Sequence, residues 1–296
     1  MSIFAIQYGP AKTGKTLASV RAFPDGLFIA PKGALTCARW LNWEPKVIEA
    51  GDSLNFGHIT TMIKQGQDKY PAIIVDDFSI LCDQELARCK QSHSGWSAFD
   101  AFNQRVYDLR DAARAADCHV ILNMHEQPPK EVKKDTGTKY IPGSPLIPGW
   151  QLPEKLPAMA DLVIRVIYDE DNSIGWPYMY QSGPDADYIT GDRLAITPEK
   201  FPLNLREVLL LAGYDVPRPK ALQFMDEHVE AISLELVKQL GERRPKLKPV
   251  LAPFAKKLKE EGIDDRHIRW IFSDALDRAQ LRKHNNNLLT NFVNTL

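Results

Sequence analysis

Gly9-Pro10-Ala11-Lys12-Thr13-Gly14-Lys15-Thr16 is the stretch of this sequence that decides its fold. It satisfies the pattern G-x-x-x-x-G-K-[ST], a loop whose backbone N–H groups cradle the phosphates of a nucleotide. Lys15 is expected to contact the β- and γ-phosphates, and the hydroxyl of Thr16 is placed to complete the shell of a magnesium ion. Together with Leu17, which follows it, the loop therefore predicts a site for ATP and Mg²⁺.

The motif requires a strand before the loop and a helix after it, and both flanks comply. Residues 2–8 are short, β-branched and aromatic, which is typical of a buried strand. Residues 17–23 can continue as a helix that ends at Pro24. Such a helix directs the positive end of its dipole at the phosphates. A glycine-rich turn that matches by chance is the alternative, and the two flanks disfavour it.

Composition sets limits on the class of protein. The chain has 296 residues, 44% hydrophobic and 25% charged, which suits one large globular domain with an appendage. Its net charge of −1 gives no global argument for nucleic-acid binding. Without a signal peptide or an apolar run of roughly 18 residues, we expect a cytoplasmic protein with no membrane partner. The cysteines lack the spacing of a zinc site and are expected to be reduced thiols: Cys37, Cys82, Cys89 and Cys118.

Two carboxylates follow the apolar run 72–75. A strand this apolar is typical of a parallel sheet with both faces covered, and ligands bind at the carboxyl ends of such strands. Asp76 is therefore expected to hold Mg²⁺, directly or through water, and Asp77 to orient the attacking water. A strand that ends in a solvated turn is the alternative.

A further apolar strand is predicted over 118–127, and it ends in polar residues at the same edge of the sheet. His125 is a candidate sensor of the γ-phosphate, and Glu126 and Gln127 share that candidacy. A structural histidine with satisfied hydrogen bonds is an equally good interpretation of His125.

The next segment, 128–149, is rich in proline, glycine, lysine and threonine, and we expect it to lack regular structure. Its lysines would suit contacts with the phosphate backbone of a nucleic acid. A solvated loop without a ligand is the alternative. The lysines concerned are Lys130, Lys133, Lys134 and Lys139.

The remaining pattern predicts an α/β fold with a mostly parallel sheet and antiparallel edge strands, because strand-like runs at 162–168, 176–181 and 187–190 have no helices between them. Residues 32–42 are expected to be helical. We predict a domain over 1–214, a proline-containing linker at 215–220 and a helical region over 221–296. That region has a basic patch at 238–259, for which nucleic-acid binding and simple solubility are equally good explanations.

In this order, the features resemble the phage-encoded RecA-type P-loop ATPases, small recombinase-like proteins associated with single-strand annealing. The resemblance covers residues 3–213 and rests on the phosphate loop followed by the segments 73–76, 123–126, 156–161, 163–166 and 187–194. It implies a RecA-like ATPase core that works as a homo-oligomer on single-stranded DNA, in the cytoplasm of the host cell. It also places a DNA-contacting loop after His125.

The resemblance makes Arg193 a candidate arginine finger that reaches the nucleotide of a neighbouring subunit. A surface arginine paired with Asp192 is the alternative. RecA-type proteins carry a catalytic glutamate just after the second strand, where this sequence has Lys32. Either Asp77 takes over that role or hydrolysis is slow.

The leading hypothesis is thus an ATPase in which Lys15, Thr16 and Asp76 hold the nucleotide and Mg²⁺ while His125 and Glu126 relay its state to the lysine-rich segment. Rival hypotheses are a motor or loader for phage replication or packaging, and a nucleotide-gated binding module with little turnover. A small-molecule kinase is disfavoured because no arginine-rich lid is evident. The C-terminal helices are a candidate surface for a phage or host replication or recombination protein.

Overall fold

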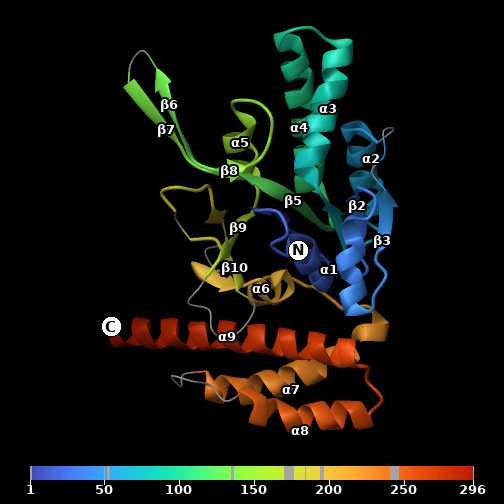
Figure 1. Ribbon diagram of the computed structural model, residues 1–296, viewed down its shortest axis with the longest axis vertical. Coiled ribbons are helices and arrows are strands. Elements are labelled where there is room, and N and C mark those ends of the chain that lie inside the picture. Colours follow the sequence, from blue (N-terminus) through green and yellow to red (C-terminus); the bar gives the residue numbers. More distant parts are fainter. Residues whose placement is uncertain are drawn as a thin grey trace.

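A mixed β-sheet forms the centre of the protein (Figure 1). The computed structural model describes residues 2–49, 51, 54–134, 137–169, 177–183, 185–193, 197–240 and 247–295, without the side chains of 134, 137 and 284–295. The main strands of the sheet are β1 (Phe4–Gly9), β2 (Leu27–Ala30), β3 (Lys46–Glu49), β4 (Ala72–Val75), β5 (His119–Gln127), β9 (Leu162–Tyr168), β10 (Tyr178–Gln181) and β12 (Lys200–Pro202).

These strands follow the order β12-β10-β9-β1-β5-β4-β2-β3. The run from β9 to β3 is parallel, whereas β10 and β12 add antiparallel pairings at one edge. Every residue of β1, β2 and β4 is buried, as expected for parallel strands covered on both faces. The predicted α/β fold class is therefore confirmed, and β5 separates the strand of the phosphate loop from the strand that leads to Asp76.

Helices cover the two faces of the sheet and form two hydrophobic clusters. One cluster contains α2 (Phe56–Gly66), α3 (Phe78–Ser92) and α4 (Trp96–Ala115), and the other contains α1 (Lys15–Ala22), α6 (Leu205–Leu211) and the C-terminal helices. Short helical turns complete the fold: α5 (Leu152–Lys155), η2 (Pro157–Met159) and η3 (Lys220–Leu222).

The helix expected over 32–42 is present as a 3₁₀ helix, η1 (Ala34–Leu41), that is irregular at Leu35. Two other local predictions were wrong. Within 128–149 the described residues form an antiparallel hairpin of β6 (Lys130–Lys134) and β7 (Gly137–Ile141), followed by β8 (Ser144–Pro145), because the segment contains β-branched and aromatic residues beside its lysines.

The second wrong prediction is a strand at 187–190, where the structure has a single bridge between Gly143 and Tyr188. Local side chains shape this segment instead: Asp185 accepts a hydrogen bond from the backbone N–H of Asp187, and Thr190 donates one to the carbonyl of Gly183. The short strand β11 (Gly191–Asp192) follows and pairs with β9.

The C-terminal helices α7 (Phe224–Gln239), α8 (Leu247–Glu260) and α9 (Asp265–Thr295) stack together at one end of the molecule (Figure 1). Their apolar residues belong to the same cluster as α1, and Val216 and Arg218 in the predicted linker are buried. The division into domains stays a prediction. Within the described ranges, no helix combines the length and apolar character needed to cross a membrane.

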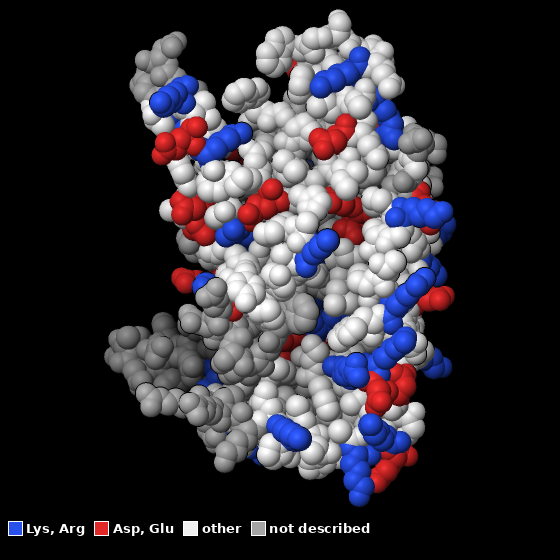
Figure 2. Space-filling view, viewed as in Figure 1, with Lys and Arg blue, Asp and Glu red and all other residues white. Residues whose placement is uncertain are grey.

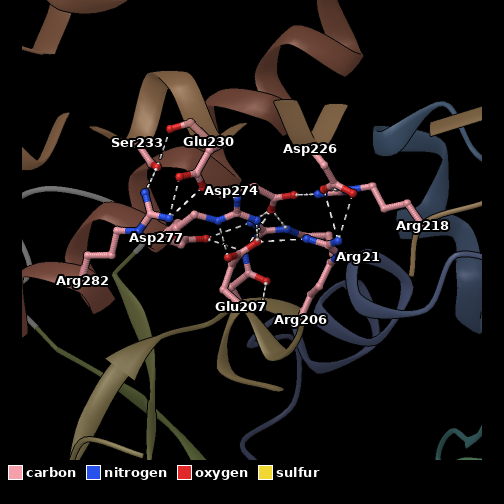
Figure 3. Close-up of polar contacts among 12 residues, drawn as sticks. Arg21, Arg206, Glu207, Arg218, Asp226, Glu230, Ser233, Asp274, Asp277 and Arg282 are labelled. Atoms are coloured by element: carbon pink, nitrogen blue, oxygen red, sulfur yellow. Dashed lines mark hydrogen bonds and ion pairs between the residues drawn. The ribbon is translucent and has the colours of Figure 1, made fainter. Parts of the chain in front are cut away.

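A buried network of ion pairs joins α1 to the C-terminal helices (Figure 3). Arg21 of α1 donates to Asp274 at 2.5 Å and to Asp277 at 2.8 Å, and both acceptors lie on α9. Arg218 pairs with the second oxygen of Asp274, and Asn204 donates to its first oxygen at 2.9 Å. The helix that follows the phosphate loop is therefore fixed directly to α9.

Candidate nucleotide-binding site

The loop between β1 and α1 has the backbone geometry of a phosphate cradle. Gly14 precedes α1 with a φ of 97°, and Lys12 has a φ of 64°, so two residues of the loop have a positive φ. Left-handed residues in a tight loop allow successive N–H groups to point toward one anion. A Cβ atom on Gly9 would lie 2.9 Å from the carbonyl oxygen of Val166, so that position requires glycine. At Gly14 the φ of 97° favours glycine.

Lys15 crosses the inside of this loop. Its Nζ donates hydrogen bonds to the carbonyl of Gly9 at 3.0 Å and to that of Pro10 at 2.7 Å. Burial lowers the pKa of the Lys15 ammonium, and the nearby carboxylates of Asp77 and Asp76 oppose that shift. The ammonium is thus held within the loop, where it can exchange these carbonyls for phosphate oxygens.

Thr16 and Asp76 lie together where β4 ends. The Thr16 hydroxyl donates to Oδ2 of Asp76 at 2.8 Å. Hydroxyl and carboxylate oxygens are ligands that Mg²⁺ prefers, and Mg²⁺ in nucleotide sites takes its other ligands from phosphates and water. Among the described residues no three of His, Cys, Asp and Glu group into a metal site. The pair therefore fits Mg²⁺ bound with a triphosphate.

The environment of Asp76 supports the same conclusion. Burial raises the pKa of its carboxyl, while hydrogen bonds oppose that rise. In the register of the sheet, Asn123 of β5 lies between Gln7 of β1 and the end of β4. Two of these opposing hydrogen bonds come from the side chains of Thr16 and Asn123. They favour the ionised form of Asp76, which is the form that binds a cation.

Asp77 and His125 form a pair beside the loop. Nε2 of His125 contacts Oδ2 of Asp77, while Oδ1 of Asp77 caps α3 by accepting from the N–H of Ser79 at 3.0 Å. His125 lies opposite Gly9 in the sheet, and its own N–H donates to the Ser79 hydroxyl at 2.9 Å. Burial raises the pKa of Asp77, and His125 opposes that rise. Both residues therefore have structural partners and also lie next to the phosphate loop.

Glu126 forms an ion pair with Arg165. Its Oε2 accepts from Nε of Arg165 on β9 at 2.6 Å, and the guanidinium of Arg165 lies 3.2 Å from the ring centroid of Tyr188. Tyr188 bridges to Gly143, at the base of the hairpin. A chain of contacts therefore runs from the end of β5 to the β6–β7 hairpin.

Other predicted site residues lie apart from the loop. Arg193 donates to the carbonyl of Ala158 at 3.1 Å and lies 3.8 Å from Asp161, which precedes β9. Asp161 also accepts from the N–H of Phe4, so Arg193 is at the end of β1 opposite to Gly9, roughly 15 Å along the strand. Lys32 is exposed just after β2, and Lys130, Lys133 and Lys139 are exposed on the hairpin. The side chain of Lys134 lies outside the described part of the structure.

The sequence analysis did not predict the hydrogen bonds that connect the phosphate loop and α1 to the sheet. Gln7 of β1 donates to the carbonyl of Lys15 at 3.2 Å and to the Ser19 hydroxyl at 2.5 Å, and it also contacts Asn123. Tyr180 of β10 donates to Gln7 at 2.5 Å. Gln7 and Asn123 are polar residues inside otherwise apolar strands. Because a buried amide needs hydrogen-bond partners, they were the sequence feature that could have predicted these hydrogen bonds.

Comparison with known proteins places this geometry in a family. A profile described as the AAA domain matches residues 3–194, which include the loop, Asp76 and the end of β5. The crystal structure of the RadB recombinase matches with a TM-score of 0.39 and 13% identity, over 60% of this chain and 79% of that chain. No curated protein matches. By the match to its profile, which covers more than half of its length, this chain belongs to the AAA domain family.

Proposed function

We propose that this protein binds ATP and Mg²⁺ at the loop of residues 9–17, hydrolyses the γ-phosphate and uses that cycle to act on single-stranded DNA in recombination or annealing of the phage type. One observation carries the proposal: β5 supplies His125 and Glu126 beside the loop and continues directly toward the lysine-bearing hairpin. One strand therefore links the nucleotide site to the surface that would contact DNA.

In this mechanism the residues position and neutralise charge rather than form covalent bonds. Lys15 and the N–H groups of the loop hold the β- and γ-phosphates, and Thr16 and Asp76 hold the metal. Mg²⁺ supplies charge neutralisation between the phosphates when it is bound. The Asp77–His125 pair lies beside the loop and would align the attacking water.

The hairpin divides its lysines between two faces. Val132 lies directly opposite Lys139, so Lys130 and Lys139 share one face, whereas Lys133 shares the other with Glu131 and Tyr140. The hairpin carries basic and acidic side chains together (Figure 2). Because phosphate contacts give most of the affinity for single strands, we assign the face of Lys130 and Lys139 to DNA.

Neutralising that face is the test of DNA binding. The double variant Lys130→Ala/Lys139→Ala is expected to bind a single-stranded oligonucleotide about tenfold more weakly and to reduce the dependence of binding on salt. Fluorescence anisotropy at several salt concentrations measures both effects. DNA-stimulated release of phosphate from ATP should fall in parallel.

A matched control is Lys256→Ala/Lys257→Ala on α8. Those lysines are also exposed, but they lie 3.8 Å from Glu260 and 3.7 Å from Glu261, so their charge is balanced locally. If both double variants bind DNA like the wild type, the hairpin assignment fails. Tight ATP binding without turnover, with or without DNA, would instead favour a nucleotide-gated module.

Arg193 is assigned to the nucleotide of a neighbouring subunit, because it lies at the wrong end of β1 for its own loop and its side chain is 47% exposed. Arg193→Ala is expected to lower ATP turnover about 10³-fold with nucleotide binding retained. Mixing Arg193→Ala with Lys15→Ala should restore part of the activity, since each subunit supplies what the other lacks. A strict monomer in the presence of an ATP analogue, or no recovery on mixing, contradicts this role.

A further inference from the structure

A cavity of about 380 Å³ lies against the helix that follows the phosphate loop. Gly14, Leu17 and Ala18 of the loop and α1 form one wall, and Trp40 of η1 and Tyr178 of β10 contribute aromatic rings. The volume and the mainly apolar lining are those of a site for a small organic molecule. Since Gly14 and Leu17 belong to both, the cavity and the phosphate loop are contiguous.

The opposite wall is the C-terminal helix α9. Arg269, Ser273 and Gln280 line the cavity at spacings of four and seven residues, which places them on one face of that helix. Within the described residues these three side chains have no hydrogen bond or ion pair to the protein. The neighbouring Asp277 is different, because Arg21 and Asn204 already bond to it. Three polar groups are therefore available to a ligand in an otherwise apolar space.

We propose that the nucleoside of the bound triphosphate enters this cavity and that Arg269, Ser273 and Gln280 of α9 select its base. The proposal rests on the proposed binding of ATP and adds the residues that determine its specificity. These residues lie beyond the match at 3–194, so they are a feature of this chain's C-terminal region.

The chemistry of a purine nucleoside suits each wall. A purine has two flat faces that stack on aromatic side chains, and Trp40 and Tyr178 offer such rings. Its edge carries donors and acceptors, and a glutamine amide can meet the donor and acceptor of adenine with both of its polar atoms. Gly14, Leu17 and Ala18 line the cavity, so a nucleotide whose phosphates lie in the loop has this wall next to its nucleoside.

The consequence is that α9 is part of the nucleotide site. The Arg21–Asp274 and Arg21–Asp277 pairs join this helix to α1, so they connect two walls of the cavity. The binding of a base would then depend on the position of the C-terminal helices, while the binding of phosphates would not.

The test compares ATP, GTP and inorganic tripolyphosphate by calorimetric titration of the full chain with Mg²⁺. Ser273→Phe, which fills the cavity, is expected to weaken ATP binding about tenfold or more and to leave tripolyphosphate binding unchanged. Gln280→Ala, which changes volume less, is expected to reduce the preference for ATP over GTP about tenfold. Unchanged tripolyphosphate binding also shows that each variant is folded.

Lys283→Ala, which removes a polar side chain from α9 outside the cavity, is the matched control and is expected to bind all three ligands like the wild type. If Ser273→Phe and Gln280→Ala bind ATP and GTP like the wild type while Lys15→Ala loses ATP, the cavity proposal is overturned and the loop stands. If Lys15→Ala also binds ATP normally, the failure lies in the proposed function itself.

Discussion

Replacing Asp274 by alanine is expected to lower the free energy of unfolding by about 3–5 kcal/mol, the loss typical of a buried ion pair that is left without one partner. The Asp274 side chain is 1% exposed and joins Arg21 of α1 to Arg218, which precedes α7. Without the carboxylate, two buried guanidinium groups lose their common partner. Urea denaturation at pH 7 measures the change.

Glu235→Ala is the control for Asp274→Ala, because it breaks an exposed ion pair with Lys238. It is expected to lower the free energy of unfolding by less than about 1 kcal/mol. Burial opposes ionisation of Asp274, but Arg21 and Arg218 outweigh it and lower the pKa to about 2. The stabilisation is therefore complete above the unfolded pKa of about 3.9 and is lost as the pH falls toward 2.

Measured as the difference between the wild type and Asp274→Asn, the stabilisation should shrink as the pH falls below about 4. Burial raises the pKa of the neighbouring Asp277 to about 6, and the charge of Asp274 adds to that rise, so a change between pH 7 and pH 5 reports Asp277. A difference that instead grows below pH 4 contradicts the assigned charge state of Asp274. A loss in Asp274→Ala no larger than that in Glu235→Ala would show that α9 is not fixed to α1 in this way.

The sequence predicted best those features that depend on local spacing or on the geometry of a parallel sheet. The loop at 9–16 needs only neighbouring residues, and its strand and helix were found where the pattern required them. Asp76 and His125 are 49 positions apart, yet Asp76 follows β4 and His125 lies in the last part of β5, and parallel strands end at one edge. That rule was sufficient to bring both beside the loop.

Features that depend on distant partners had no such signal. Arg21 and Asp274 are separated by 253 positions, and nothing in either local pattern indicates the other. Arg165 was part of a recognised strand, but its pairing with Glu126 and Tyr188 depends on the order of strands in the sheet. The β6–β7 hairpin was not predicted because its many lysines gave the segment the composition of a loop. Strand formation there depends on the structural context, which the local sequence does not show.

Replacing Lys15 by alanine is expected to lower ATP turnover at least about 100-fold, which is the typical cost of removing one fixed group that stabilises the transferred phosphate. The Lys15 ammonium is buried within the loop and bonded only to the carbonyl groups of Gly9 and Pro10 and to the Thr13 hydroxyl in the described structure. No other described lysine of the loop reaches its interior. Phosphate release under saturating ATP, with and without single-stranded DNA, measures the effect.

Lys12→Ala is the matched control, since it removes the same charge from the same loop at a position where the side chain is exposed. It is expected to change turnover by less than about threefold, because a solvated charge contributes little at this range. Equal losses in the two variants would mean that the loop responds to total charge and not to the position of the Lys15 ammonium. A large loss confined to Lys15→Ala, with folding unchanged by circular dichroism, ties turnover to the interior of the loop.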